Sequence, residues 1–401
     1  MSAEHPAARA EEPHRRWRGL PRTVWVLGWV SLLMDVSSEL VHSLLPIFMT
    51  TVLGASMVTV GVVEGIAEAT AAITKVFSGA LSDWVGRRKG LVVIGYAFSA
   101  LTKPFFPLAQ SMLWVLGARF LDRVGKGVRD APRDALIADV TPPARRGAAY
   151  GLRQSLDSIG AFIGPLVAMA ALALWAGNLR AVLWLAVVPA LLAVGLLVAG
   201  IREPERDAAA PAPHLPLSRA ALRALPRRYW WVVALGAVFA LARFSEAFLV
   251  LRAQQLGVPL QWVPGVMLLM SVVYALVAYP AGVLADRWPA RRLLAWGVLM
   301  LMLADALLAA ARGPLLVCAG AAVWGVYMGF TQGLLSKLVA DAAPPALRGT
   351  AFGVFNLVTG VSLLLASVLA GALWASIGAG ATFLTGAALA GLTVLGLLLL
   401  R

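Results

Sequence analysis

Long apolar runs alternate with short polar stretches from about residue 23 to the end of the chain. A helix needs about 20 mostly apolar residues to cross a bilayer, and many of these runs reach that length. The pattern therefore predicts an all-α polytopic membrane protein. We expect twelve transmembrane helices near residues 23–52, 57–83, 90–109, 112–136, 148–173, 179–200, 229–253, 264–285, 292–311, 314–338, 350–375 and 379–400.

One stretch of sequence occurs twice, half a chain apart. Residues 138–153 read ADVTPPARRGAAYGLR and residues 340–355 read ADAAPPALRGTAFGVF, an offset of 202 residues. A Gly-x-x-x-Asp motif followed by two arginines recurs at nearly the same offset, beginning at Gly79 and at Gly282. The chain is therefore a duplication, which predicts two pseudo-symmetric six-helix bundles with a substrate site between them, as in transporters.

The polar stretches divide the chain into parts. We expect a cytoplasmic tail at 1–22, an N-terminal six-helix bundle at 23–200, a cytoplasmic linker at 201–228 and a C-terminal six-helix bundle at 229–401. The linker is rich in Pro, Ala and charge, which is typical of a solvated tether, although residues 217–225 could form a short helix on the membrane surface. The first apolar run exceeds the roughly 7–15 residues of a signal-peptide core, so we expect it to remain as the first transmembrane helix.

Composition and charge agree with a membrane protein. The chain is 60% hydrophobic and 13% charged, with a mean hydropathy of +0.81 and a net charge of +14. Such a charge could indicate nucleic-acid binding, but 20 of the 34 lysines and arginines lie in the predicted tails and loops on the side of the termini, whereas on the opposite side only Arg312 lies in a loop and Arg180 near a helix start. This is the positive-inside pattern. It predicts cytoplasmic termini and no nucleic-acid partner, and we expect the plasma (inner) membrane of a prokaryote.

Three motifs resemble signatures of the major facilitator superfamily. Residues 79–89, GALSDWVGRRK, resemble its loop 2–3 signature, and residues 119–127, RFLDRVGKG, resemble its helix 4 signature. Residues 160–165, GAFIGP, resemble the front of the antiporter motif found mainly in exporters. The resemblance covers the chain from about residue 23 onward. It implies the superfamily's twelve-helix fold, alternating access, a monomer, and kinship with the drug or metabolite:proton antiporters.

The chain departs from these signatures at three places. Trp84 stands where the superfamily usually has Arg, and Arg123 stands where the helix 4 pattern has Gly. The usual glycine pair after Pro165 is missing. Because that motif is the main mark of exporters, the sequence leaves the direction of transport open.

A conformational latch is expected at the cytoplasmic helix ends. Gly79 would let helices 2 and 11 approach closely, as small residues do in membranes. Asp83 could pair with Arg129 or Arg133 and face a helix N-terminus, which would favour the outward-facing state. In the alternative, the loop 2–3 cations only anchor the topology. The candidate latch set comprises Gly79, Asp83, Gly86, Arg87, Arg88, Arg129, Asp130, Arg133, Asp134, Gly282 and Asp286.

Helix 5 contains a second candidate for a moving part. Gly160, Gly164 and Pro165 could form a bend about which the helix rocks. The alternative is that the two glycines only allow close packing against a neighbouring helix.

Ionisable residues at membrane depth are the sharpest functional signal. Each costs about 2.5–3.5 kcal/mol at the bilayer centre on insertion scales, so such residues usually line a cavity and pair with one another. Asp35, Glu39 and Glu68 are the favoured proton carriers, and static ion pairing is the alternative. The predicted proton-coupling set in the central cavity comprises Asp35, Glu39, Glu64, Glu68, Arg119, Asp122, Arg123 and Glu246.

A second set is predicted to line the substrate cavity. Tyr274, Tyr327 and Phe355 could form its C-terminal wall, because they fall within helices 8, 10 and 11. The whole set comprises His42, Lys103, Asp157, Arg243, Tyr274, Tyr327 and Phe355.

The function predicted is proton-coupled export of a small polar or amphiphilic organic compound. Proton-coupled import of a polar or anionic nutrient is the alternative. Divalent-metal export is less favoured, because nearby Arg and Lys oppose a cation, and we predict no metal site. No nucleophile motif, phosphate-binding loop or His/Cys cluster occurs in the sequence, so neither an enzyme nor a cofactor is expected. A non-transporting sensor is also not expected, because it would need an additional soluble domain. The sequence does not identify the substrate.

Overall fold

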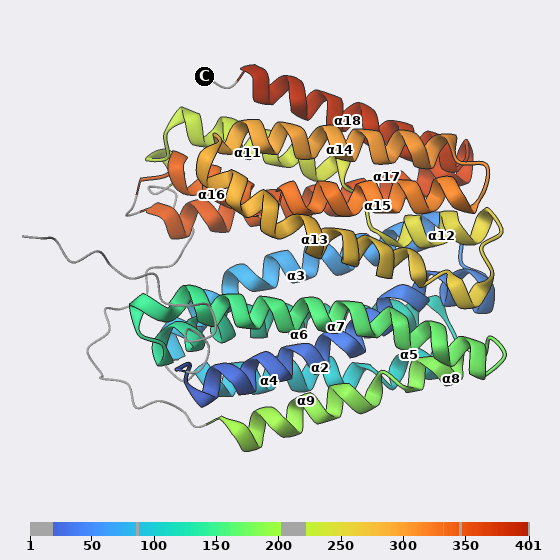
Figure 1. Cartoon of the computed structure of the whole chain (residues 1–401), viewed down its shortest axis with the longest axis horizontal. Helices are drawn as coiled ribbons and strands as arrows, with labels where there is room; N and C mark the ends of the chain where they lie inside the picture. Colours follow the sequence, from blue (N-terminus) through green and yellow to red (C-terminus); the bar gives the residue numbers. More distant parts are fainter. Residues whose placement is uncertain (1–18, 86–87, 202–221, 332, 345–346, 400–401) are drawn as a thin grey trace, which may run out of the picture.

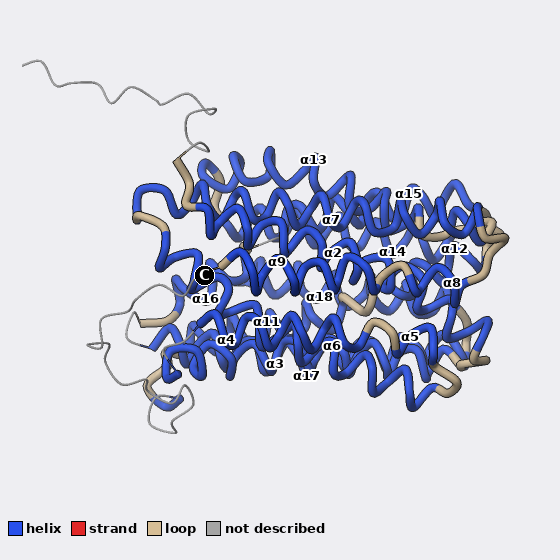
Figure 2. Tube along the Cα trace, turned by 90° about the horizontal axis from the view of Figure 1, so that it is seen from below, coloured by secondary structure: helices blue, strands red, loops and turns tan. Residues whose placement is uncertain are grey.

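The computed structural model describes residues 19–85, 88–201, 222–331, 333–344 and 347–399. These residues form helices and loops, and none of them lies in a strand (Figure 2). The helices run side by side along the long axis of the molecule (Figure 1). The all-α prediction is therefore confirmed.

The helices before the linker gather in one bundle, drawn in the lower part of Figure 1. They are α2 (Arg22–Ile47), η1 (Phe48–Val52), α3 (Met57–Val85), α4 (Arg88–Thr102), α5 (Phe105–Leu108), α6 (Met112–Val140), η2 (Pro143–Arg145), α7 (Arg146–Leu174), α8 (Leu179–Trp184) and α9 (Val187–Gly200).

The helices after the linker form the bundle above it. They are α11 (Arg227–Ala242), α12 (Ala247–Gln255), η3 (Leu260–Trp262), α13 (Gly265–Arg287), α14 (Ala290–Ala310), α15 (Pro314–Thr331), α16 (Leu334–Ala342), α17 (Arg348–Ser376) and α18 (Ala379–Leu399). Most of the predicted tail and linker lies outside the described residues, so the predicted domain limits stay a prediction.

Eleven helical passages in the described part of the chain are long and apolar enough to cross a membrane. The twelfth passage, α6, is as long as α3 and α7 and lies among the other helices (Figure 1). It has a stripe of charged residues that keeps its hydropathy low. Most of these charged side chains are buried inside the protein, including Arg119, Asp122 and Arg123. The predicted twelve-helix architecture is therefore confirmed.

Four of the passages predicted as single helices are interrupted. The helix over 90–109 breaks after Thr102, where Pro104 lacks the amide hydrogen that a continuous helix needs. The helix over 314–338 breaks near Gly333, whose φ of 75° suits glycine and few other residues. The helix over 179–200 breaks before Val187, and there the Ser37 hydroxyl of α2 donates to the Ala186 carbonyl at 2.7 Å.

The fourth interruption separates α11 from α12, and neither proline nor glycine causes it. Residues 243–246 read Arg-Phe-Ser-Glu and leave the helix. Two side chains take over backbone hydrogen bonds there: the Ser245 amide donates to Ser367 Oγ at 3.2 Å, and the Ala247 amide donates to Ser245 Oγ at 3.3 Å. Non-helical backbone at membrane depth needs such partners.

The two bundles meet most extensively where α3 packs along α17. A Cβ added at Gly61 would lie 2.2 Å from the Ser367 carbonyl oxygen, and one at Gly371 would lie 2.3 Å from that of Met57. At the end of the molecule away from the start of α2, α12 also packs on α2, and η3 packs on α7. The bundles therefore touch at that end as well as along α3 and α17.

The predicted role of Gly79 in the approach of helices 2 and 11 is wrong. A Cβ added at Gly79 would meet the Ala131 side chain of α6 at 3.6 Å, an ordinary contact distance. The close approach of α3 to α17 instead depends on Gly61, which lies five turns earlier on the same helix. Positions 18 residues apart lie on the same face of a straight helix, so helical periodicity alone cannot tell which of the two touches the partner.

Candidate functional site

The interruption between α11 and α12 lies between two adjoining cavities. The larger has a volume of about 320 Å³ and is lined by residues of α11, α15, α16 and α17 together with Arg243. The smaller has a volume of about 190 Å³ and is lined by residues of both bundles. Arg243, Met328 and Leu363 line both cavities, so the interrupted segment forms part of the wall that they share.

The smaller cavity brings together predicted residues that are far apart in sequence. His42 and Glu68 reach it from α2 and α3, and Arg243, Ser245 and Glu246 reach it from the interrupted segment. Three acid–base groups and one arginine therefore line a single space between the bundles.

A chain of polar contacts links that space to α6. His42 Nδ1 lies 3.6 Å from Glu39 Oε2, and His42 Nε2 lies 4.0 Å from Glu64 Oε2. Arg119 donates to Glu64 Oε2 at 2.8 Å, and both side chains are fully buried. The Ser245 hydroxyl donates to the same oxygen at 3.4 Å, so Glu64 connects the two bundles.

Glu68 has a looser partner. Its Oε1 lies 3.8 Å from an Arg123 nitrogen, and its side chain is 36% exposed, whereas that of Glu64 is completely buried. A group that borders a cavity and is loosely paired is better placed to exchange a proton than one enclosed in a tight pair. Among the predicted proton-coupling residues, Glu68 and Glu246 are the two that line the smaller cavity.

Lys103 and Asp122 form a separate buried pair. Lys103 Nζ donates to Asp122 Oδ1 at 2.9 Å and to Ser38 Oγ at 3.1 Å. Lys103 lies at the interruption between α4 and α5 and is almost completely buried. It was predicted to line the substrate cavity, but it does not line either of the two cavities described above.

Other candidates also do not line those two cavities, namely Asp35, Glu39, Glu64, Arg119, Asp122, Arg123, Asp157 and Tyr274. Asp157 pairs with Arg153 of its own helix at 2.8 Å. Asp35 lies on α2 against Gly160 of α7, and Tyr274 lies on α13 beside Gly325 of α15. Tyr327 and Phe355, by contrast, line the larger cavity as predicted.

Gly160 and Gly164 hold α7 against α2. A Cβ added at Gly160 would lie 2.6 Å from the Leu32 carbonyl oxygen, and one at Gly164 would lie 2.9 Å from that of Val36. The close-packing alternative therefore describes both glycines. Pro165 lies within α7, which continues to Leu174.

The candidate latch is described only in part. Gly86, Arg87 and the side chains of Asp83 and Asp286 lie outside the described residues, so the latch stays a prediction. Around Gly282, no heavy atom lies within 4 Å of an added Cβ in the described part of the chain.

The basic latch candidates have partners near α6. Arg133 lies 3.6 Å from Asp130 and 3.3 Å from Asp134 of the same helix. Arg129 lies over the Tyr96 ring, 4.6 Å from its centroid, and donates to Ser99. Arg88 pairs with Asp139 at 2.9 Å, which ties the start of α4 to the end of α6.

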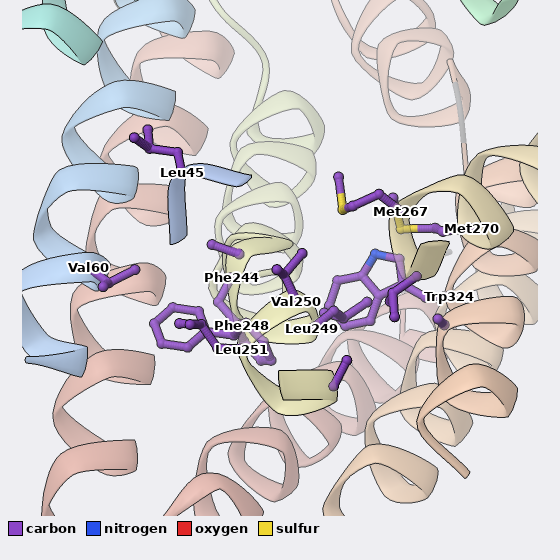
Figure 3. Packing of buried hydrophobic residues seen from close by; sticks show 14 of the residues in the cluster. Leu45, Val60, Phe244, Phe248, Leu249, Val250, Leu251, Met267, Met270 and Trp324 are labelled. Atoms are coloured by element: carbon purple, nitrogen blue, oxygen red, sulfur yellow. The ribbon is translucent and has the colours of Figure 1, made fainter. Parts of the chain in front are cut away.

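Sequence analysis missed several residues of the site. Phe239, Met328 and Leu363 line the larger cavity, and Ser367 supports the interrupted segment. They are ordinary apolar or small residues within transmembrane helices, so no local signal distinguishes them. Figure 3 shows that Phe244, in the interrupted segment, and Phe248, in the first turn of α12, lie among apolar residues that include Met267 and Trp324.

No group of three or more His, Cys, Asp and Glu side chains in the described ranges is arranged to hold a metal ion.

Comparison with known proteins identifies the family. The profile of the Major Facilitator Superfamily matches residues 27–273 and 253–401. The chain belongs to this superfamily. It is therefore an integral membrane transporter of small molecules and not an enzyme.

Three similar proteins illustrate the range of the superfamily. The uncharacterised MFS-type transporter MJ1317 of Methanocaldococcus jannaschii is 30% identical over 392 residues, which is 96% of this chain and 95% of that protein. Multidrug resistance protein MdtH of Photorhabdus laumondii is 32% identical over 139 residues, 34% of each chain. The crystal structure of nucleoside transporter NupG has a TM-score of 0.75 at 15% identity, covering 94% of this chain and 98% of that one, so it shares the fold.

Proposed function

We propose that this transporter is proton-coupled and exports a small amphiphilic organic compound by alternating access. The observation that carries the proposal is the smaller cavity, where Glu68, Glu246 and His42 lie beside Arg243 between the two bundles. Acids that border a water-accessible space between two moving bundles can bind a proton on one side of the membrane and release it on the other.

The interrupted helix supports alternating access. Discontinuous transmembrane helices recur at transporter binding sites, where they leave backbone groups free to move and bind. The break between α11 and α12 borders both cavities, and Ser245 within it bonds across to Glu64. A change of charge in the cavity can therefore act on the contact between the bundles.

Export is favoured over import by the partial similarity to a multidrug resistance protein and by the GAFIGP sequence in α7. Proton-coupled import of an anionic compound is the second candidate. The presence of a positive Arg243 in the cavity wall favours it. In either case we expect a monomer in the plasma (inner) membrane of a prokaryote, with both termini in the cytoplasm.

The test is transport in proteoliposomes that contain a pH-sensitive dye, with an imposed pH gradient and a panel of drugs and metabolites. For the proposed exporter, a transported compound should drive protons in the direction opposite to its own flux. Proton movement in the same direction would establish the importer. Transport of a compound without proton movement would refute proton coupling.

The carboxylates can be tested in the same vesicles. Glu68→Gln and Glu246→Gln should each reduce substrate-driven proton movement to the level of empty liposomes, because an amide cannot exchange a proton. Asp341→Asn, on an exposed acid of α16, is the matched control and should leave proton movement unchanged. Full proton coupling in both glutamine variants would place the proton carriers elsewhere.

A further inference from the structure

Arg243 is the one formally charged side chain among the described residues that line the larger cavity. The lining consists of aromatic and aliphatic residues, a few hydroxyl groups and Arg243. Its volume of about 320 Å³ lies at the lower end of the range for small-molecule sites, roughly 300–1,000 Å³. The cavity therefore combines an apolar body with a single positive point.

Arg243 lies beside Tyr327 but has no close carboxylate partner in the described part of the chain. It follows the last residue of α11, at the start of the interruption, and its side chain is exposed along the cavity wall. Among the described residues, no carboxylate lies within 4.0 Å of it. An unpaired cation at membrane depth is costly, and its presence usually marks a functional site.

Three of the other deep cations, Arg119, Lys103 and Arg252, differ from Arg243. Arg119 and Lys103 each have a carboxylate oxygen within 2.9 Å. Arg252, on α12, donates to the carbonyls of Leu308 and Ala311 at 3.2 and 2.8 Å. These side chains are held by the protein itself, whereas Arg243 retains hydrogen-bond donors that face a cavity.

The acids nearest in sequence and space do not enter the larger cavity. Glu246 and Glu68 line the smaller cavity, on the other side of the shared wall, and neither lines the larger one. A ligand in the larger cavity therefore meets the guanidinium without a carboxylate in the lining to compete for it.

The apolar part of the cavity has a defined shape. Phe239 and Tyr327 pack edge to face, with ring centroids 6.1 Å apart. Phe355 lies over Gly236, where an added Cβ would come within 2.4 Å of its ring. Their packing fixes these rings, and they give the cavity an apolar border.

From these contacts we infer that the substrate is an amphiphilic organic anion. Its carboxylate or sulfonate binds the Arg243 guanidinium, and its apolar body lies against Phe239, Phe355 and Met328. Arginine suits this role because its planar donors match a carboxylate or sulfonate in two parallel hydrogen bonds. The inference names the substrate class and rests on the proposed transport function.

Binding of three matched compounds to the purified protein tests the inference. 2-Naphthoate, 2-naphthamide and 2-naphthylmethylamine share one apolar body and carry a negative, neutral or positive head. The carboxylate should bind roughly tenfold or more tightly than the amide and the amine, because a hydrogen bond to a charged group adds this much affinity. Calorimetry or tryptophan fluorescence gives the dissociation constants.

Variants connect that preference to the residue. Arg243→Gln should remove the preference for the carboxylate while leaving the weak binding of the amide, and Arg243→Lys should retain part of it. Arg312→Gln, on an exposed arginine of the loop before α15, is the matched control and should change nothing. Ser336→Trp, on an exposed position of the cavity wall, should weaken binding of all ligands without removing the charge.

Two results would overturn the inference. One is equal or tighter binding of the amide or the amine by the unaltered protein, which requires no variant to fold. The other is absence of carboxylate binding at millimolar concentration. Either result leaves the vesicle test of proton-coupled transport intact, whereas anion binding without any transport would refute the proposed function and reduce the inference to an anion-binding site at Arg243.

Discussion

At the scale of single residues, the buried ammonium of Lys103 depends on a single carboxylate among the described residues. Asp122 accepts a hydrogen bond from it at 2.9 Å, and the pair lies at the interruption between α4 and α5. Removing one member of a buried pair leaves an uncompensated charge, and this costs about 3–5 kcal/mol. The pair therefore contributes to the stability of the N-terminal bundle more through the penalty of breaking it than through net attraction.

Asp122→Asn should consequently lower the thermal unfolding temperature of the protein in detergent, by several degrees or more. Asp305→Asn is the matched control. Asp305 is fully buried and forms no ion pair with any described residue. Its conversion to an amide leaves no charge without a partner, so the unfolding temperature should change little. The double variant Lys103→Met with Asp122→Leu should recover much of the loss. Equal effects of the two Asp→Asn changes would show that Lys103 does not depend on Asp122.

At the scale of helices, the contact of α3 with α17 depends on the absence of side chains. Gly61 and Gly371 bring backbone atoms of the two helices closer than any Cβ would allow. Packing of this kind stabilises helix pairs in lipid, where no hydrophobic force drives association. The contact also joins the two bundles, so a change in it affects both stability and the motion between them.

Gly61→Ala should force α3 and α17 apart and lower the unfolding temperature. Gly117→Ala, on α6, provides the control, because an added Cβ there meets no atom within 4 Å. It should leave stability unchanged or raise it by about 1 kcal/mol, the usual preference of a helix for Ala over Gly. Unfolding temperatures measured in the same detergent compare the two. If Gly61→Ala were as stable as Gly117→Ala, the close packing would not be needed.

At the scale of the whole molecule, topology decides on which side of the membrane each cavity mouth and each loop lies. Basic residues gather in the predicted loops on the side of the termini, which predicts that this side faces the cytoplasm. The two exposed arginines Arg287 and Arg312 flank α14 and should therefore lie on opposite sides. The chain has one natural cysteine, Cys318, so a background without cysteine requires a single substitution.

In a Cys318→Ser background, Arg312→Cys should react with a membrane-impermeant maleimide in intact cells. Arg287→Cys should react only after the membrane is permeabilised. For each variant, the amount of bound maleimide is measured after the protein has been purified. Labelling of Arg287→Cys in intact cells would invert the predicted topology and place the termini outside the cytoplasm.

Much of the architecture could be predicted from the sequence because its causes are local or repetitive. A run of apolar residues must be helical in lipid whatever surrounds it, since its backbone can find hydrogen-bond partners only within the helix. The repeat of residues 138–153 at 340–355 predicted the two bundles before any contact was known. The sequence also predicted the ionisable cavity residues His42, Glu68, Arg243 and Glu246, because an ionisable residue within an apolar run usually lines a cavity.

The rest depends on contacts between residues that are distant in sequence. The interruption at residues 243–246 is supported by Ser367, a residue 122 positions away on α17. Gly61 rather than Gly79 meets that same helix, although both lie on one face of α3. Among the described residues, Arg243 has no carboxylate partner of the kind that Arg119 has, and the residues next to either arginine in the sequence do not predict this difference. The sequence by itself determined which segments cross the membrane and which of them carry charge. Only the tertiary structure decided which charges pair and which remains free to bind a ligand, because pairing depends on distances that a linear pattern does not contain.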